Sequence, residues 1–167
     1  MANILHNMDL HRYESLAFFS DLDRADLEVL SPCFDSAMYV AGTTIFEQGD
    51  KADRLHLVAS GEVSIRYKPD DGPVMTVTRV QPGSVFGWSA AAGNARYTSS
   101  AVCSLDSEIL SVEGDDLRRL FEQNPRIGNV LNERLSLVVA DRRKSQQGKY
   151  NIPAVERLTQ GNSPGGG

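Results

Sequence analysis

Apolar and polar residues follow two kinds of pattern along the chain, and each predicts a different kind of structure. Between Leu16 and Leu30 the apolar positions recur at helix-like intervals, and residues 20–23 offer caps for a helix that ends near Pro32. From residue 36 to 112, short runs alternate between apolar and polar side chains, as strands with one buried face do. After these runs the helical spacing returns. The pattern therefore predicts a mainly β domain with helices at both ends.

Glycines divide the β region at intervals of about ten residues. They are Gly42, Gly49, Gly61, Gly72 and Gly83. Regular turn signals between short alternating strands are typical of a small antiparallel sandwich or roll. The sequence therefore favours a double-sheet roll of the jelly-roll type for this part of the chain.

Two helices are expected after the β region. The first carries Leu117 and Leu120 and ends before Pro125, and the second runs from about Arg126 into the 140s. One apolar stripe of the second helix consists of Ile127, Leu131, Leu135 and Val138. A second apolar set, Val130 and Leu137, falls off this stripe. The second set either packs within the monomer or meets a partner chain or a ligand.

The composition adds limits on domain number and location. The chain has 167 residues, of which 41% are hydrophobic, and this is enough for one domain with its own core. We expect a flexible N-terminus at 1–14, one domain at 15–147 and a Gly-rich tail at 148–167. The start of the chain has no apolar signal core, and the longest uncharged apolar run, 135–140, is too short to span a membrane. These features favour a cytoplasmic protein.

Charge and reactive residues exclude several classes of function. The net charge of −5 argues against binding to nucleic acid, and the one basic cluster, 142–144, suits a helix C-terminus. Cys33 and Cys103 match no metal-ligand spacing and are most simply buried thiols. The three histidines belong to no Ser-His-Asp order, and no P-loop or paired-acid motif occurs. The sequence therefore predicts no enzyme, no metal and no required cofactor.

The stretch from Gln81 to Ala101 holds the candidate binding site. A turn at 82–83 is followed by a short strand end, by Gly87, and by a small-residue segment that predicts a short helix. The first amides of such a helix lack partners within it and suit a phosphate, and Arg96 follows nearby. A short helix that only fills a gap between two strands explains the same residues.

Several spaced motifs between residues 16 and 145 resemble the cyclic nucleotide-binding domain. They are Gly42-x-x-Ile45-Phe46-x-Gln48-Gly49-Asp50, Ala52-Asp53-x-Leu55-x-Leu57-Val58-x-Ser60-Gly61-Glu62-Val63, Pro82-Gly83-x-Val85-Phe86-Gly87 and Ser107-Glu108-Ile109-Leu110. The resemblance implies a β-roll with N-terminal helices and two C-terminal helices. It also implies a regulatory domain in which a ligand at the phosphate-binding cassette repacks the last helix. The helix-turn-helix module of transcription factors such as the catabolite activator is not expected after residue 145.

Two positions depart from the family's cassette. The family has a Glu that accepts a hydrogen bond from the ribose 2′-hydroxyl, and here the position is Trp88, whose single N–H cannot accept one. The family also has an Arg that pairs with the cyclic phosphate. Counted back from the following strand, that position is Tyr97, and Arg96 lies one residue earlier. If the strand register holds, this step turns the guanidinium to the opposite side of the chain, whereas a loop at this point absorbs the shift.

Three interpretations follow from these departures. The pocket binds cyclic AMP or cyclic GMP weakly, it takes an altered ligand that stacks on Trp88 or Tyr97, or Trp88 fills it and the domain is a scaffold for protein partners. Signalling through the last helix implies a homodimer along residues 126–145 or a separate effector protein. The residues expected to line a retained site are Val85, Phe86, Gly87, Trp88, Ser89, Ala90, Arg96, Tyr97, Thr98 and Ser99.

Overall fold

The computed structural model describes residues 10–89 and 95–149, the side chains of 141–149 excepted. In chain order its helices are α2 (Leu10–Glu14), η1 (Ala17–Phe19), α3 (Arg24–Leu30), η2 (Ser31–Cys33), α5 (Gly114–Gln123) and α6 (Pro125–Lys149). Its strands are β1 (Asp35–Tyr39), β2 (Thr44–Phe46), β3 (Arg54–Ser60), β4 (Val63–Tyr67), β5 (Met75–Val80), β6 (Val85–Phe86), β7 (Ser100–Cys103) and β8 (Ser107–Glu113). The expected order, helices then strands then helices, is confirmed.

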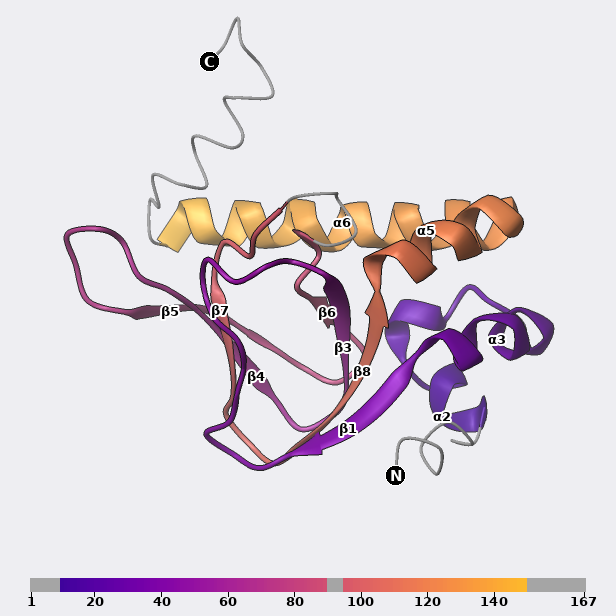
Figure 1. Cartoon of the computed structure of the whole chain (residues 1–167), viewed down its shortest axis with the longest axis horizontal. Coiled ribbons are helices and arrows are strands. Elements are labelled where there is room, and N and C mark those ends of the chain that lie inside the picture. Colours follow the sequence, from indigo (N-terminus) through magenta and orange to yellow (C-terminus); the bar gives the residue numbers. More distant parts are fainter. Residues whose placement is uncertain (1–9, 90–94, 150–167) are drawn as a thin grey trace, which may run out of the picture.

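The strands form two antiparallel sheets of four strands. Their orders are β1-β8-β3-β6 and β2-β7-β4-β5, so neighbours in each sheet are mostly distant in sequence. The two sheets enclose a roll, with the N-terminal helices at one end and α5 and α6 along one side (Figure 1). This arrangement confirms the predicted β-roll with flanking helices.

Alternation along β3 separates two cores. Leu55 and Leu57 belong to a cluster shared with the helices, which we call the helix-side core, while Val58 belongs to a cluster between the two sheets, the roll core. His56 is buried between Leu55 and Leu57 in sequence, and its ring stacks on the roll-core residue Phe86. A strand directs successive side chains to opposite faces, so the period of two in the sequence produces both cores.

The fold begins earlier than the flexible segment 1–14 would imply. Residues 1–9 lie outside the described part of the chain, but α2 covers Leu10–Glu14. Tyr13 is buried in the helix-side core, and Arg12 pairs with the buried Glu108, which also accepts a hydrogen bond from Ser36 Oγ at 2.8 Å. The sequence around residues 10–14 shows no clear period because α2 is short and its partners lie far along the chain.

Helix α3 has the N-terminus that the sequence predicted. Asp23 is its N-cap, and its side chain accepts a hydrogen bond from the Asp26 amide while the Asp26 carboxylate accepts one from the Asp23 amide. The helix ends at Leu30 and is followed by a 3-10 turn that contains Pro32. By contrast, α5 begins at Gly114 without a side-chain cap, and the Gly114 amide donates to the Asp53 carbonyl at 2.9 Å.

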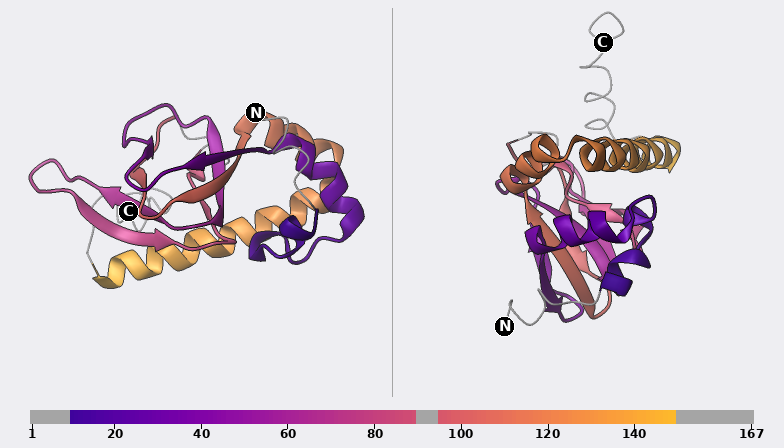
Figure 2. Two further views of the ribbon diagram at one scale, coloured as in Figure 1. Left: turned by 90° about the horizontal axis from the view of Figure 1, so that it is seen from below. Right: turned by 90° about the vertical axis from the view of Figure 1, so that its right-hand side faces the viewer.

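The long helix α6 buries only part of its surface. Ile127 and Leu131 are buried in the helix-side core, and Leu135, Val138 and Val130 pack against it while staying partly exposed. Leu137 is 64% exposed. The helix begins near the N-terminal helices and then runs along the roll beside β5 (Figure 2). The predicted stripe is therefore confirmed, and of the second apolar set only Leu137 faces solvent.

Candidate functional site

The short strand β6 and Gly87 form the floor of the expected site. β6 pairs with β3, with Phe86 opposite His56 and Val85 opposite Leu57. Gly87 has φ of 73°, and a Cβ added there would lie 3.1–3.3 Å from atoms of His56, Phe46 and Tyr97. Both its backbone conformation and this close approach favour glycine at position 87.

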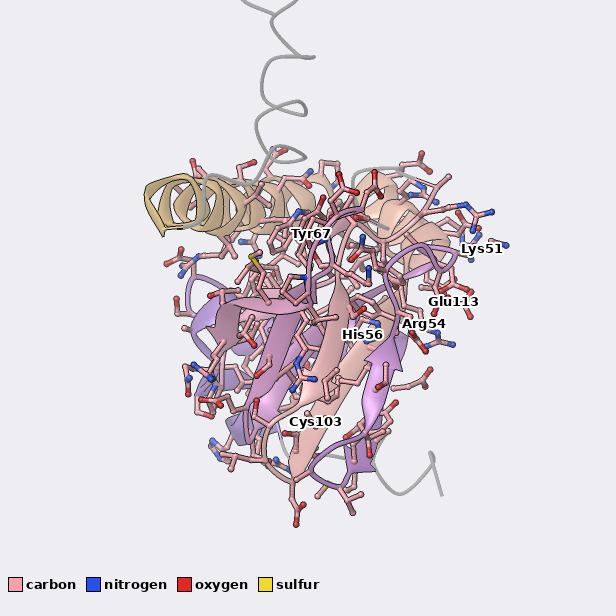
Figure 3. All side chains as sticks on the ribbon, turned by 90° about the vertical axis from the view of Figure 1, so that its left-hand side faces the viewer. Lys51, Arg54, His56, Tyr67, Cys103 and Glu113 are labelled. Carbon is pink, nitrogen blue, oxygen red and sulfur yellow. The ribbon has the colours of Figure 1, made fainter. Side chains whose placement is uncertain are left out.

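An aromatic group lies against Gly87 inside the roll. It consists of Phe46, His56, Phe86 and Tyr97, and we call it the aromatic stack. The rings of Phe46 and Tyr97 are nearly parallel, with centroids 3.7 Å apart, and His56 stacks on Phe86 at 5.1 Å. All four side chains are buried. The stack joins β2, β3, β6 and the chain before β7, and it forms the inner wall next to Gly87. Figure 3 labels His56, the member of the stack on β3.

Arg96 and Tyr97 point to opposite sides of the chain. Tyr97 is 5% exposed and belongs to the roll core, whereas Arg96 is exposed. The Arg96 guanidinium donates to the Gly49 carbonyl at 2.7 Å, outside the roll. Backbone hydrogen bonds to residues 49 and 50 hold this register, since Tyr97 N donates to Asp50 O and Gly49 N donates to Tyr97 O, both at 2.9 Å. Arg96 and Tyr97 therefore lie on opposite sides of the chain, with Tyr97 inside the roll.

The Tyr97 hydroxyl is fully used by the backbone of β3. It donates to the Arg54 carbonyl at 2.6 Å and accepts from the Arg54 N–H at 3.1 Å. Burial raises the pKa of Tyr97 above its usual value, although the hydrogen bond from the Arg54 backbone opposes this shift. A buried tyrosine needs a partner for its hydroxyl, and here both the donor and the acceptor are satisfied. The ring is thus held in one position.

His56 is the polar ring of the stack, and it carries no charge near neutral pH. Burial, with a smaller contribution from the charge of Arg54, lowers the pKa of His56 from 6.5 to about 3. Its Nδ1 lies in a hydrogen bond 2.7 Å from Ser111 Oγ. The Arg54 guanidinium itself is turned toward Asp35 and Glu113, at 3.6 and 3.4 Å. The wall beside Gly87 is therefore aromatic and electrically neutral.

The other expected site residues have mixed positions. Val85, Phe86 and Ser89 are buried, Ser99 is half-buried and Thr98 is exposed. Ala90 lies outside the described residues. Trp88 is half-buried and packs against the helix-side core. The atoms nearest to a Cβ added at Gly87 belong to His56, Phe46 and Tyr97, so the interpretation in which Trp88 fills the pocket stays a prediction.

Sequence reasoning did not include Phe46 and His56 in the site. His56 lies between Leu55 and Leu57, so the period of a strand puts it on the opposite face from these two residues. Only the pairing of β3 with β6 brings that face to Gly87. The sequence therefore indicates on which face of β3 His56 lies, but it does not indicate that β6 is the neighbouring strand.

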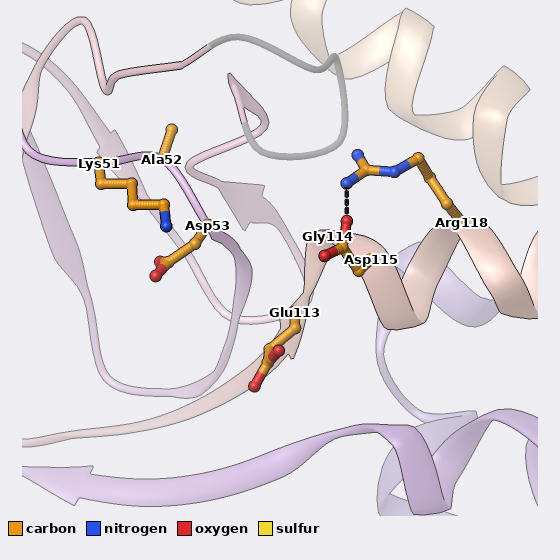
Figure 4. A pocket seen from close by; sticks show the side chains of 7 residues that line it. All are labelled: Lys51, Ala52, Asp53, Glu113, Gly114, Asp115 and Arg118. Atoms are coloured by element: carbon orange, nitrogen blue, oxygen red, sulfur yellow. Dashed lines mark hydrogen bonds and ion pairs between the residues drawn. The ribbon is translucent and has the colours of Figure 1, made fainter.

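A separate hollow of about 260 Å³ lies where α5 begins (Figure 4). It is lined by Lys51, Ala52, Asp53, Glu113, Gly114, Asp115 and Arg118. Arg118 is ion-paired to Asp115 within this lining. The lining holds three carboxylates and two cations, so it offers no excess positive charge to an anion. None of the binding-site residues predicted from the sequence lines this hollow.

Contacts connect the turn before β6 with α6. Phe18 N of η1 donates to the Gly83 carbonyl at 3.0 Å, and a Cβ added to Gly83 would lie 2.9 Å from Ala17 N. The Arg134 guanidinium of α6 donates to the Ala17 carbonyl at 3.0 Å and is ion-paired to Asp21. Turn, 3-10 helix and α6 are therefore in direct contact, one after the other.

A second ion pair holds the start of α6. Arg126 pairs with the buried carboxylate of Asp26 on α3. Burial raises the pKa of Asp26, but the hydrogen bonds from Arg126 and from the Asp23 amide outweigh it, and the pKa is lower than usual. Asp26 is thus ionised over the physiological range and keeps α6 attached to the N-terminal helices.

Comparisons with known proteins agree with the roll and its cassette. The family model for the cyclic nucleotide-binding domain matches residues 37–124, more than half of the chain. The chain belongs to the cyclic nucleotide-binding domain family. A solved Geobacter metallireducens protein named for cyclic nucleotide binding is 30% identical, with a TM-score of 0.68 over 79% of this chain and 96% of that one.

Members of the family with known roles are also similar to the chain. The cyclic AMP receptor protein of Thermus thermophilus is 29% identical over 68% of this chain and 52% of its own length. A cAMP-dependent protein kinase regulatory subunit of Aspergillus fumigatus is 29% identical over 65% of this chain and 25% of its own length. The chain thus spans about half or less of these relatives. In residues 10–89 and 95–149, no helix is long and apolar enough to cross a membrane.

Proposed function

We propose that this domain is a regulatory sensor that binds a nucleotide-related ligand beside Gly87 and transmits its occupancy through α6. The observation that carries the proposal is the contact sequence from Gly83 through Ala17 to Arg134. A ligand beside Gly87 touches the segment that follows this turn. A shift of β6 therefore changes the contact between the turn at Gly83 and η1. Because Arg134 donates to the Ala17 carbonyl, η1 passes this change to α6.

The names of the relatives support a regulatory, non-catalytic role. They are those of a cyclic AMP receptor and of a cAMP-dependent regulatory subunit. A ligand transmits a signal only if it binds the two arrangements of α6 with different affinity. Leu135 and Val138 of α6 are only partly buried against the helix-side core. Little buried surface therefore has to be separated when this part of the helix moves.

The exposed side of α6 around Leu137 fits either a second copy of the chain or a separate effector. Leu137 is 64% exposed on the part of α6 that extends along the roll. The same observation favours a second candidate function, a scaffold that acts through a protein partner without any small ligand. The two functions differ in whether a ligand changes α6.

The test measures binding and the response of α6 together. Calorimetric titration with cyclic AMP, cyclic GMP, adenosine and guanosine at millimolar concentration finds any nucleotide-related ligand. Amide hydrogen exchange in 125–140, with and without that ligand, reports on α6. We expect exchange to change on binding in the wild type, and to change less in Arg134→Ala although the ligand still binds.

Arg119→Ala is the matched control. Arg119 has an ion-pair partner as Arg134 does, but it is exposed and its partner, Asp116, lies within the same helix, α5. We expect this variant to respond to ligand as the wild type does. Binding without any change in α6 would refute transmission, and the absence of binding by all four compounds would leave the scaffold as the function.

A further inference from the structure

The wall beside Gly87 lacks a positive charge. The buried polar and charged residues in the described part of the chain are Asp26, Ser31, Ser36, His56, Ser64, Ser89, Ser107, Glu108 and Ser111. None of them is a lysine or an arginine. The segment 90–94, which follows the site in sequence, reads Ala-Ala-Ala-Gly-Asn and is also without a basic residue.

The half-buried arginines are directed elsewhere. Arg54 faces Asp35 and Glu113, and Arg134 is bonded to Asp21 and Ala17 at the helical end. Arg96, the arginine nearest in sequence, is held outside the roll by its bond to Gly49 O. Moving its guanidinium inward would require breaking the backbone pairing of residues 95–97 with 49–52.

The inward position is occupied by Tyr97 instead. Its ring lies 3.7 Å from that of Phe46, and its hydroxyl has no capacity left, because Arg54 N–H and C=O use it as acceptor and donor. The second polar ring, His56, is neutral and bonded to Ser111. An anion placed against this wall would lose its water and gain no counter-charge, which is strongly unfavourable.

We propose that Tyr97 sets the ligand class of the site, so that it accepts an uncharged molecule with an aromatic ring and excludes an anionic cyclic phosphate. An aromatic wall without net charge suits such a ligand, since rings stack favourably on one another. The position of this site rests on the proposed function. The ligand class that Tyr97 selects is a separate claim.

Adenosine and cyclic AMP form the matched pair of probes, because they share base and ribose and differ in the phosphate. Calorimetry with the wild-type chain is expected to give adenosine an affinity at least tenfold higher than that of cyclic AMP. The double exchange Arg96→Tyr with Tyr97→Arg moves the guanidinium inward. It should raise the affinity for cyclic AMP about tenfold to a hundredfold, the usual effect of one charged hydrogen bond.

Ser99→Arg keeps the experiment decisive if the exchange fails to fold. Ser99 is half-buried two residues after Tyr97, so this variant adds a guanidinium while the stack is retained. It should also gain cyclic AMP affinity, whereas Tyr97→Phe, which adds no charge, should not. Thermal melting establishes which variants are folded.

Two results would overturn the inference. One is wild-type binding of cyclic AMP at least as tight as that of adenosine, lost in Arg96→Ala, which would place the displaced arginine on the phosphate. The other is a folded exchange or Ser99→Arg variant with no gain for cyclic AMP. If these variants gain affinity for cyclic AMP but α6 does not respond to binding, the role of Tyr97 is supported and the proposed transmission is refuted. Failure of the inference and failure of the proposed function are therefore distinguishable.

Discussion

The two faces of the sheet β1-β8-β3-β6 have different chemical character. On its outer face, Leu55 and Leu57 of β3 pack into the helix-side core, and these two aliphatic side chains have no hydrogen-bonding groups. Its inner face carries His56, whose ring stacks on aromatic neighbours and is bonded to Ser111. Dispersion and burial stabilise Leu55 and Leu57, whereas His56 on the inner face also depends on its hydrogen bond with Ser111. Aliphatic residues of similar size can therefore replace the two leucines, whereas a replacement of His56 also removes the partner of Ser111.

The largest effect on stability is expected from the helix-side core, against which the outer face of the sheet packs. Phe19 is completely buried, with ring centroids 5.4–5.7 Å from those of Phe18, Phe34 and Tyr13. Phe19→Ala should lower the free energy of unfolding by about 3–5 kcal/mol, the usual effect of truncating a buried aromatic ring. Urea denaturation measures it, with the exposed Val29→Ala on α3 as the control. A loss below about 1 kcal/mol would contradict the central place of Phe19 in this core.

The pH dependence of stability distinguishes the inner face. Because the pKa of His56 is 6.5 when unfolded and about 3 when folded, the unfolded chain takes up a proton between these values and the folded chain does not. Its contribution is constant above pH 6.5 and declines by about 1.4 kcal/mol per pH unit as the pH falls toward 3.

The comparison with His56→Phe isolates this contribution from that of the carboxylates. Between pH 6 and pH 4 the wild type should lose about 3 kcal/mol more than the variant, measured as the free energy of unfolding in urea. The variant keeps a ring in the stack but cannot titrate. Parallel pH profiles of the two proteins would show that His56 is protonated in the folded state.

A smaller effect is expected when only the hydroxyl of Tyr97 is removed. Tyr97→Phe retains the ring against Phe46 but leaves Arg54 N–H and C=O without their partner. The free energy of unfolding should fall by roughly 1–2 kcal/mol. The control is Tyr67→Phe, a half-buried tyrosine that packs against the same roll core. Equal losses in the two variants would mean that the bonds to Arg54 are not what holds Tyr97.

Local patterns determined most of the fold. The alternation from residue 36 to 112 predicted the strands, Asp23 and Pro32 bounded α3, and the apolar stripe of α6 predicted Ile127 and Leu131 as its buried residues. These features depend on neighbours within a few positions, so the sequence alone is sufficient for them. Helix α2 was missed because its burial comes from distant partners.

Only the tertiary structure decided which residues surround Gly87. The sequence placed Arg96 and Tyr97 on opposite sides only on condition that the strand register holds, whereas the pairing with residues 49 and 50 decides that Tyr97 is the inner one. The stacking of Tyr97 on Phe46 and the packing of Trp88 against the helix-side core are likewise long-range. Side-chain periodicity determines which residues share a face, whereas the identity of what that face meets depends on strand pairing across the chain.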